Sequence, residues 1–382
     1  MVSGVIAEFN IFHNGHKYLV EKAREESDAV VAVMSGSFVQ RGDVAITDKW
    51  SRARMALMNG VDLVLELPVC YALNAAPRFA EGGVNTLAAL GIVDTLVFGS
   101  ECGDTDSLVR AADMLENEDK NTAGKIKSYM ADGMNYPSAL SKAYSGKVAE
   151  ELLSKPNDIL ALEYIRAVMR SECDMKPRAI KRRFAEHDGK EVNGGFASAS
   201  AIRERLMNGE DISELIPYPL DVIGENPYLL SRLDSAFATR LRGISASELQ
   251  NISEVSEGLE NKILAAAMEC DGFTAIAEKV KSKRYTMSRI RRILIASLIG
   301  FTKDIYSPYP DYIRVLGMNK TGAGLLKEAK NKCSVPIITK TADFKEDSKM
   351  FRLDLRATDI AALCAPYTRH GGADFTHSPV II

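Results

Sequence analysis

Residues 2–16 read VSGVIAEFNIFHNGH, an apolar run followed by two histidines, His13 and His16, that flank a glycine. The run Val2–Ala7 predicts a buried strand, and helical spacing begins at His16. Gly15 lets the backbone pass close to a ligand, and a helix N-terminus favours phosphate there. Two imidazoles add donors that stabilise charge on a departing pyrophosphate. A turn with two locally satisfied histidines is the simpler interpretation, but the position between strand and helix favours a phosphate site.

The first hundred residues alternate between strand and helix patterns. Apolar runs predict strands at Ala29–Met34, Val61–Leu67 and Thr95–Phe98, and amphipathic spacing predicts helices at Thr47–Asn59 and Pro77–Leu90. Such strands are typical of a parallel sheet covered on both faces, and right-handed crossovers give a doubly wound layer. We therefore predict an α/β fold with a Rossmann-like, doubly wound parallel sheet. Its ligand site is expected at the carboxyl ends of the strands.

Beyond residue 100, helical patterns dominate, with two candidate segments of another kind. These are a fifth strand at Ala179–Phe184 and a small αβ unit formed by Tyr312–Leu316, Gly322–Asn331 and Val335–Thr339. A proline-containing linker begins at Ile216. We predict a Rossmann-like domain at 1–215 and a mainly helical C-terminal domain, including the small αβ unit, at 216–382.

The composition is that of a globular protein. The 382 residues carry a formal net charge of −3, with 26% charged and 46% hydrophobic residues. No apolar run reaches the roughly 20 residues that cross a bilayer, and the N-terminus lacks a basic leader with a cleavage site. The six cysteines are scattered without metal-ligand spacing, which indicates free thiols in a reducing compartment. We therefore predict a cytoplasmic protein with no membrane segment and no structural metal site.

A second motif supports the phosphate-site hypothesis. The segment Ala197–Arg203 reads ASASAIR, in which Ser198 or Ser200 is placed to cap a helix that carries Arg203. Together with the His-x-Gly-His turn, this segment resembles the two signatures of the nucleotidylyltransferase superfamily, the second being of the type Ile-Ser-Ser-Thr-x-x-Arg. The resemblance implies a fold of that type in which Ser200 and Arg203 hold the triphosphate of ATP.

Seven segments extend the resemblance over essentially the whole chain. They are EFNIFHNGH (8–16), MSGSFVQRG (34–42), KWSRARMAL (49–57), VDLVLELP (61–68), FGSE (98–101), KPNDILALEYI (155–165) and KRYTMSRIRRIL (283–294). Together they resemble the tRNA(Met) cytidine acetate ligase family. The resemblance implies an enzyme that forms acetyl-AMP from ATP and acetate and then acetylates N4 of the wobble cytidine of elongator tRNA(Met), giving N4-acetylcytidine. Ile11 departs from the family's usual Asn-Pro-Phe-His loop, which should loosen the approach to His13 slightly without removing a catalytic group.

The predicted site joins these motifs to the loops at the strand ends. His13 and His16 are the predicted catalytic residues, and we expect Mg²⁺ to share with them the charge on departing pyrophosphate. The residues predicted to bind ATP are Ala7, Glu8, Phe9, Asn10, Phe12, Asn14, Gly15, Gly99, Ser100, Asn157, Arg182, Arg183, Ser200 and Arg203.

Several of these assignments have a structural alternative. Gly99 and Ser100 also suit a plain β-to-α turn, and Asn157 also suits a helix cap; the family resemblance favours ATP contact for Gly99 and Asn157. One of Arg182 and Arg183 is expected to reach the nucleotide while the other faces solvent or RNA, because neighbouring residues of a strand point to opposite faces.

Two basic residues are candidates for neutralising the negative charge of acetate or phosphate. Arg41 follows a predicted strand and Lys49 begins a predicted helix, so either is placed to neutralise acetate or phosphate charge. Each also suits a solvated surface position, and the sequence does not favour one interpretation.

The stretch Lys279–Arg292 contains seven basic residues and no acidic one. Basic runs are usually solvated faces, but Tyr285 among the cations and the family resemblance favour contacts with an RNA backbone and stacking on a base. The predicted RNA-binding residues are Lys281, Lys283, Arg284, Arg289, Arg291 and Arg292, with Arg240 and Arg242 as an extension. The expected partner is tRNA rather than DNA.

Two other functions fit parts of the pattern. A small-molecule adenylyltransferase that makes a cofactor dinucleotide accounts for both motifs but not for the long C-terminal extension. A non-catalytic RNA-binding protein with an ATP-sensing Rossmann layer accounts for the basic stretch but not for the two histidines. No residue stands out in the sequence as a general base for the transfer to cytidine.

Overall fold

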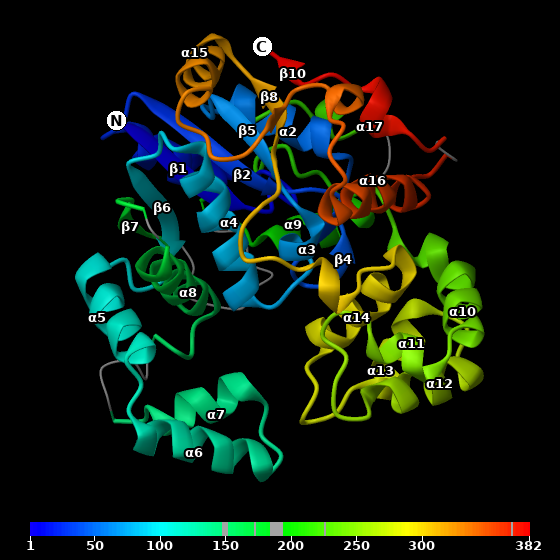
Figure 1. Cartoon of the computed structure of the whole chain (residues 1–382). Helices are drawn as coiled ribbons and strands as arrows, with labels where there is room; N and C mark the ends of the chain where they lie inside the picture. Colours follow the sequence, from blue (N-terminus) through cyan, green and yellow to red (C-terminus); the bar gives the residue numbers. More distant parts are fainter. Residues whose placement is uncertain (147–151, 172, 184–193, 225–226, 368–369) are drawn as a thin grey trace.

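The computed structural model describes residues 1–146, 152–171, 173–183, 194–224, 227–367 and 370–382. A central sheet lies between helices (Figure 1), and two helical parts project below it: α6 and α7 at one side and α10–α14 at the other. In the described part of the chain, every helix is too short or too polar to span a bilayer.

The helices and strands of the first half largely follow the predicted pattern. They are β1 (Val2–Ala7), α1 (Asn14–Arg24), β2 (Ala29–Ser35), β3 (Phe38–Val39), β4 (Asp43–Val44), α2 (Lys49–Met58), β5 (Leu63–Leu67), α3 (Val69–Ala72), α4 (Ala76–Leu90), β6 (Thr95–Ser100), α5 (Thr105–Glu116), α6 (Lys120–Ala131), α7 (Tyr136–Ala143), α8 (Pro156–Arg170), β7 (Lys176–Lys181) and α9 (Ala199–Met207).

The second half begins with helices and ends with strands. Its elements are η1 (Leu220–Ile223), η2 (Leu230–Leu233), α10 (Asp234–Gly243), α11 (Ala246–Gln250), α12 (Leu259–Glu269), α13 (Phe273–Val280), α14 (Met287–Ile299), η3 (Lys303–Ile305), β8 (Ile313–Met318), α15 (Lys320–Ala329), β9 (Ile337–Ile338), η4 (Thr341–Asp343), α16 (Lys349–Ala362), α17 (Ala373–Thr376) and β10 (Val380–Ile381).

The burial of β2 explains why the sheet needs helices on both faces. Every residue of β2 is buried. Val31 and Val33 pack in the core that includes α4 and α8, whereas Val30 and Ala32 pack in the core that includes α1 and α2. Successive side chains of a strand point to opposite faces, so a continuous apolar run can be satisfied only between two layers of helices.

The strand order places the histidine turn at the topological switch point. The order is β10–β8–β5–β2–β1–β6–β7, with β9 beside β8. From β1 the chain moves outward through β2 and β5 and then crosses to β6 on the other side of β1. A ligand crevice therefore opens at the carboxyl ends of β1 and β6. The predicted fold class is confirmed.

The C-terminal part departs from the predicted domain boundary. The small αβ unit does not stand apart: β8 pairs with β5, antiparallel, and β10 pairs with β8. Residues 313–381 thus complete the sheet of the N-terminal domain, because β5 would otherwise present an open edge. The helices that lie apart from the sheet in this half of the chain are η2 and α10–α14, which we call the helical unit. We propose that this unit is a distinct domain.

A short hairpin that was not predicted follows β2. Phe38 pairs with Val44 and Val39 with Asp43. The turn ends at Gly42, whose φ of +74° lies in the left-handed region that favours glycine. Strands of two residues fall below the length at which an apolar pattern is recognisable.

Candidate active site

Two histidines define the turn between β1 and α1. The Nδ1 of His13 accepts a hydrogen bond from the Gly15 amide at 3.0 Å, and the Nδ1 of His16 accepts one from the His13 amide at 3.3 Å. The ring centroids lie 4.0 Å apart. Because both Nδ1 atoms accept, each neutral ring carries its proton on Nε2. The pair is thus arranged as hydrogen-bond donors rather than as cations.

The surroundings of the histidines keep both rings neutral. The pKa of His16 is lowered to about 3, mainly by burial and then by the charge of Arg182, although a hydrogen bond with the Ile11 backbone acts in the opposite direction. Burial, followed by its charged neighbours, also holds the pKa of His13 well below its usual range. Those neighbours include Arg182 and Arg203, so the predicted histidines and two of the predicted arginines form one cluster.

Apolar side chains hold the histidine turn in place. Phe9, Ile11 and Phe12 are fully buried, and the Oδ1 of Asn10 accepts a hydrogen bond from the Ile46 amide at 2.8 Å. The peptide bond between Asn10 and Ile11 is cis. Phe9, Asn10 and Phe12, predicted to bind ATP, therefore shape the turn with buried side chains. The expected loosening at His13 stays a prediction.

Arg52 joins the loops that follow β1 and β2. Its guanidinium is fully buried and donates to the carbonyl oxygens of Glu8 at 2.9 Å, Ser35 at 2.8 Å and Thr47 at 3.3 Å, and also to that of Gly36. Burial lowers its pKa to about 10. We did not predict a role for this residue; the only signal was its place in the KWSRARMAL segment.

The second motif lies directly over the first. The Nδ2 of Asn14 donates to the carbonyl oxygens of Gly195 and Glu214, each at 2.8 Å, and Arg203 donates to the carbonyl oxygen of Asn10. Ser198 caps α9, whereas exposed Ser200 accepts a hydrogen bond from Arg203 at 3.3 Å. Arg203 thus joins the second motif to the loop of the first, and Asn14 binds the segments on either side of the second motif.

On the other side of β1, a carboxylate organises the predicted nucleotide contacts. Glu101 accepts hydrogen bonds from the Nδ2 of Asn157 at 2.6 Å and from the Asp158 amide at 2.9 Å, so it caps α8. The Oδ1 of Asn157 accepts from Arg182 at 3.3 Å. Glu101 was not predicted, because it lies 56 residues from Asn157 in the sequence.

Gly99 and Ser100 end β6 in different environments. A Cβ on Gly99 would lie 3.4 Å from the Arg182 side chain, so Gly99 borders the arginine of the site. Ser100 is fully buried; its hydroxyl donates to Asp158 at 2.5 Å and accepts from the Gly103 amide at 2.9 Å. Its side chain therefore positions the α8 N-terminus. Ala7 is the last residue of β1.

The two neighbouring arginines have separate environments. Arg182 lies beside Asn157 and lowers the pKa of both histidines. The Arg183 guanidinium lies 4.5 Å from the ring centroid of Tyr18 on α1. Of the alternatives that the sequence left open, Arg182 is the arginine that faces the histidine turn.

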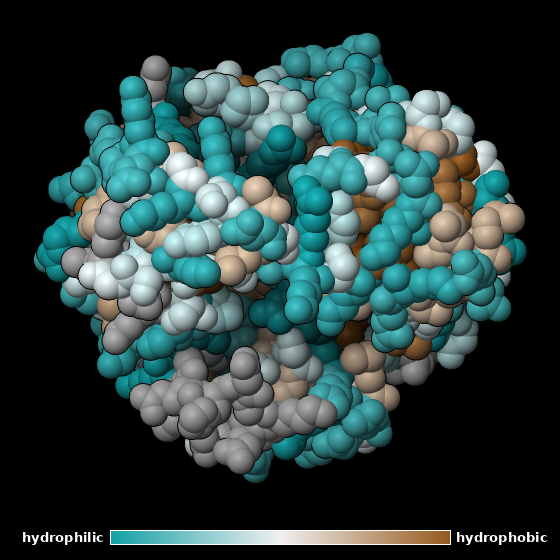
Figure 2. Space-filling view, turned by 90° about the horizontal axis from the view of Figure 1, so that it is seen from below, coloured by the Kyte–Doolittle hydropathy of each residue, from teal (hydrophilic) through white to brown (hydrophobic). Residues whose placement is uncertain are grey.

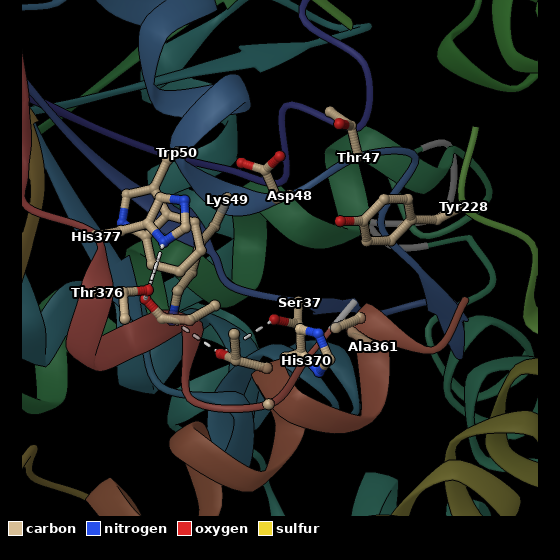
Figure 3. A pocket seen from close by; sticks show the side chains of 14 residues that line it. Ser37, Thr47, Asp48, Lys49, Trp50, Tyr228, Ala361, His370, Thr376 and His377 are labelled. Atoms are coloured by element: carbon tan, nitrogen blue, oxygen red, sulfur yellow. Dashed lines mark hydrogen bonds between the residues drawn. The ribbon is translucent and has the colours of Figure 1, made fainter. Parts of the chain in front are cut away.

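A cavity of about 230 Å³ adjoins the loop after β2. Figure 3 shows Trp50 stacked on His377, with Ser37, Thr47 and Tyr228 on other walls. The carbonyl oxygen of Thr47 accepts from Arg52, which also binds the Glu8 carbonyl. The Arg52 side chain thus connects the cavity wall at Thr47 to the loop that carries the histidines.

Lys49, at the base of this cavity, is already neutralised. It is 1% exposed and lies 2.7 Å from Glu66 and 2.8 Å from Asp374. Arg314 pairs with the same Asp374 at 2.7 Å. Because the Lys49 ammonium is already paired with these buried carboxylates, Arg41 is the remaining candidate for neutralising the charge of acetate or phosphate.

Known proteins resemble the chain over its whole length. The family model described as HIGH Nucleotidyl Transferase matches residues 1–374. The tRNA(Met) cytidine acetate ligase of Thermoanaerobacter sp. (strain X514) is 40% identical over 396 residues, covering 98% of each chain, and that of Caldanaerobacter subterraneus subsp. tengcongensis is 39% identical over 398 residues, covering 99% of this chain and 98% of the relative. The chain belongs to the tRNA(Met) cytidine acetate ligase family.

The family's solved structures have the same fold. The crystal structure of Thermotoga maritima TmcAL bound with alpha-thio ATP is 33% identical, covers 100% of this chain and 99% of its own, and superposes with a TM-score of 0.90. The apo form of the same protein gives a TM-score of 0.92. Family membership therefore extends to the helical unit and the C-terminal strands, as well as to the histidine turn.

Within this family fold, the predicted RNA-binding residues divide into two groups. Lys281, Lys283 and Arg284 are exposed in the loop between α13 and α14, where Arg284 also pairs with the partly exposed Glu257 at 2.9 Å. Arg292 is only 7% exposed and pairs with Glu254 at 2.5 Å. The lower face of the molecule, where α6, α7 and α11–α13 lie, is mainly hydrophilic (Figure 2). The exposed group remains a proposed RNA contact, whereas the Arg292 charge is neutralised within the protein.

The other members of the basic segment also have internal partners. Arg289 donates to the carbonyl oxygen of Glu254 at 2.9 Å, and Arg291 pairs with Asp43 at 2.7 Å. Tyr285 is 8% exposed, so its ring is not presented for the stacking that we expected. Arg240 and Arg242 donate to carbonyl oxygens of Ser297 and Ala267. The acids and carbonyls come from distant segments, which the local sequence could not reveal.

Proposed function

We propose that this chain is an ATP-dependent ligase that forms acetyl-AMP from ATP and acetate and acetylates N4 of the wobble cytidine of elongator tRNA(Met), giving N4-acetylcytidine. The observation that carries the proposal is the neutral His13–His16 pair at the switch point, next to Arg182 and Arg203. The names of relatives that cover 98% of the chain support the substrates. Such a tRNA substrate favours a cytoplasmic location.

In the first step, a carboxylate oxygen of acetate attacks the α-phosphorus of ATP, and the bond to pyrophosphate breaks. The Nε2–H groups of His13 and His16 donate toward the phosphate oxygens on which charge accumulates. Arg182 and Arg203 supply positive charge without a proton transfer. Burial of the turn strengthens each of these interactions, because the local dielectric is low.

Mg²⁺ is part of the proposal as a companion of ATP. The residues that the structure describes contain no group of three His, Cys, Asp or Glu side chains placed to hold a metal ion. Mg²⁺ commonly binds through substrate phosphates and water with few protein ligands. It would thus arrive with the triphosphate and add charge neutralisation there.

In the second step, the N4 amine of cytidine attacks the acetyl carbonyl and an N–C bond forms. AMP leaves with the bonding electrons, and the amine releases one proton to solvent. An aromatic amine is a weak nucleophile, so an adenylate leaving group makes this step feasible. We propose that the cavity at Trp50 and Tyr228 receives the cytosine. Its walls come from the start of α2, from Tyr228 just before η2, and from α16 and α17.

Nucleoside mass spectrometry tests the proposal. Purified protein is incubated with elongator tRNA(Met), ATP, Mg²⁺ and isotope-labelled acetate, and the tRNA is digested. We expect labelled N4-acetylcytidine only when ATP is present. Binding of tRNA without labelled nucleoside would favour a non-catalytic RNA-binding role. A small-molecule adenylyltransferase would instead consume ATP with nicotinate mononucleotide or phosphopantetheine, an activity for which the family-wide C-terminal extension gives no reason.

A further inference from the structure

The loop after β2 is held from two sides at Gln40. The Gln40 amide donates to Oε1 of Glu8, in the histidine loop, at 2.8 Å. The Gln40 carbonyl oxygen accepts from Nη1 of Arg292, on α14 of the helical unit, at 3.0 Å. Both backbone polar groups of one residue are therefore bound, one by the ATP-site turn and the other by the helical unit.

The next residues of the loop are fixed by the same helix. Arg291 donates to the Gly42 carbonyl oxygen at 2.8 Å and pairs with Asp43 at 2.7 Å. A Cβ on Gly42 would lie 2.6 Å from the Arg291 Cβ and 2.7 Å from the Arg292 amide. The loop thus packs against α14 with no room for a side chain at Gly42. The backbone of Arg41, between Gln40 and Gly42, has little freedom.

Arg292 is itself anchored within the helical unit. Its Nε and Nη2 donate to the two carboxylate oxygens of Glu254 at 2.5 and 2.8 Å, a bidentate pair. Both side chains are nearly buried, with 9% and 12% of their surface exposed. Bidentate pairs fix geometry as well as charge. The path Glu254–Arg292–Gln40–Glu8 therefore links the helical unit to the histidine turn by hydrogen bonds at each step.

The side chain of Arg41, in contrast, has no fixed partner. It is exposed and makes no hydrogen bond or ion pair with any residue that the structure describes. Burial raises the pKa of Glu8 and lowers that of Arg203, and the nearby charge of Arg41 lowers the pKa of both groups. Glu8 uses an oxygen for the Gln40 amide, and Arg203 is bound to Asn10 and Ser200. With Arg52, which also acts on Glu8, and Asp43, which also acts on Arg203, three guanidinium groups face two carboxylates. One positive charge is left unbalanced, which suits an anion.

The sheet order indicates which anion this is. Asn157 and Arg182 approach the histidine turn from the β6–β7 side, whereas Arg41 approaches from the β2 side. In an in-line displacement at phosphorus, the attacking and leaving oxygens lie on opposite sides. We propose that Arg41 binds the carboxylate of the acyl substrate and that the Arg292–Glu254 pair positions it. This inference rests on the proposed function.

The test measures acetate-dependent exchange of labelled pyrophosphate into ATP, without tRNA, as a function of each substrate. For Arg41→Ala we expect KM for acetate to rise by about 10- to 100-fold, the loss of a charged hydrogen bond, with KM for ATP changed less than about twofold. Arg41→Lys should recover part of the acetate affinity through its point charge. Arg110→Ala, which removes an exposed arginine on α5, is the control and should match wild type.

The positioning pair is tested in the same assay. Glu254→Gln should raise KM for acetate and lower kcat while KM for ATP stays within about twofold. A purely structural defect would instead change both KM values and the melting temperature together. A rise in KM for ATP equal to that for acetate in Arg41→Ala would place Arg41 among the phosphate ligands and overturn the inference, as would unchanged kinetics. Absence of acetate-dependent exchange in wild type would instead remove the proposed function itself.

Discussion

The backbone amide of His13 donates a hydrogen bond to the imidazole Nδ1 of His16 at 3.3 Å, while the Nδ1 of His13 accepts from the Gly15 amide at 3.0 Å. The two rings therefore complete the capping of α1 as well as facing the ligand crevice. Capping at this position satisfies amides that would otherwise lack partners, and it fixes the tautomer of both rings. The hydrogen bonds that cap the helix therefore also fix the Nε2–H groups as the donors for the chemistry.

The histidine pair should make stability depend on pH. The pKa of His16 is about 3 in the folded state and about 6.5 in an unfolded chain, so the unfolded state binds more protons between these values. Stability is fully present above pH 6.5 and is lost as pH falls, by about 1.4 kcal/mol per pH unit for this residue. The lowered pKa of His13 acts in the same direction.

Urea unfolding of wild type and His16→Gln at pH 5.0, 6.0 and 7.0 measures this dependence. Comparing the two proteins removes the contributions of other titrating groups. We expect the free energy of unfolding of His16→Gln to fall less steeply below pH 6.5 than that of wild type. Parallel curves would mean that His16 is protonated equally easily in both states.

The two neighbouring arginines should differ in their effect on ATP. Arg182 lies 3.3 Å from Asn157 at the site, whereas Arg183 lies over Tyr18. Arg182→Ala should raise KM for ATP by about tenfold or more, because a charged hydrogen bond to phosphate is lost. Arg183→Ala should change it by less than about twofold and cost at most about 1 kcal/mol of stability. The reverse order would reassign the two residues.

Filling the cavity should separate the two half-reactions. Thr376 lines the cavity and is exposed, so tryptophan at this position can be accommodated without disturbing the core. In Thr376→Trp we expect acetate-dependent pyrophosphate exchange at the wild-type rate, with tRNA acetylation reduced by at least about tenfold. Thr376→Ser is the matched control. Full acetylation by the tryptophan variant would place the cytosine elsewhere.

The exposed part of the basic segment should contribute to tRNA affinity through charge alone. Replacing Lys283 and Arg284 together by alanine removes two exposed cations, one of which, Arg284, also pairs with Glu257. The change should weaken tRNA binding and reduce the slope of log K against log salt by about 1.5 if both cations contact phosphate. Filter binding between 50 and 200 mM salt gives the slope. An unchanged slope would show that this loop lies off the tRNA surface.

The sequence predicts most of the sheet because its signals are local. The apolar β2 run demands cover on both faces, and the predicted helix at Pro77–Leu90 is found as α4, which Gly91 ends in a left-handed conformation. The hairpin at Phe38–Val44 and the return of β8 to β5 were missed. The first is too short to show a pattern, and the second depends on an edge that forms about 250 residues earlier.

The same distinction explains the site. The histidine turn is recognisable because its chemistry lies within four consecutive residues, whereas Glu101 and Arg52 act on residues 56 and 44 positions away. The prediction that the basic segment Lys279–Arg292 presents free cations was wrong for Arg292, because its partner is distant in the sequence. The segment's lack of local acids suggested free cations, but Glu254 lies 38 residues before Arg292 and neutralises it.

Acetate-dependent ATP–pyrophosphate exchange, measured for wild type, His16→Ala and the surface control Lys17→Ala, tests the account most directly. Wild type and Lys17→Ala should exchange at equal rates, and His16→Ala should be slower by about 100-fold or more, since a donor to the transition state is lost, while still binding tRNA. Exchange that needs nicotinate mononucleotide or phosphopantetheine instead of acetate, or full exchange by His16→Ala, would contradict it.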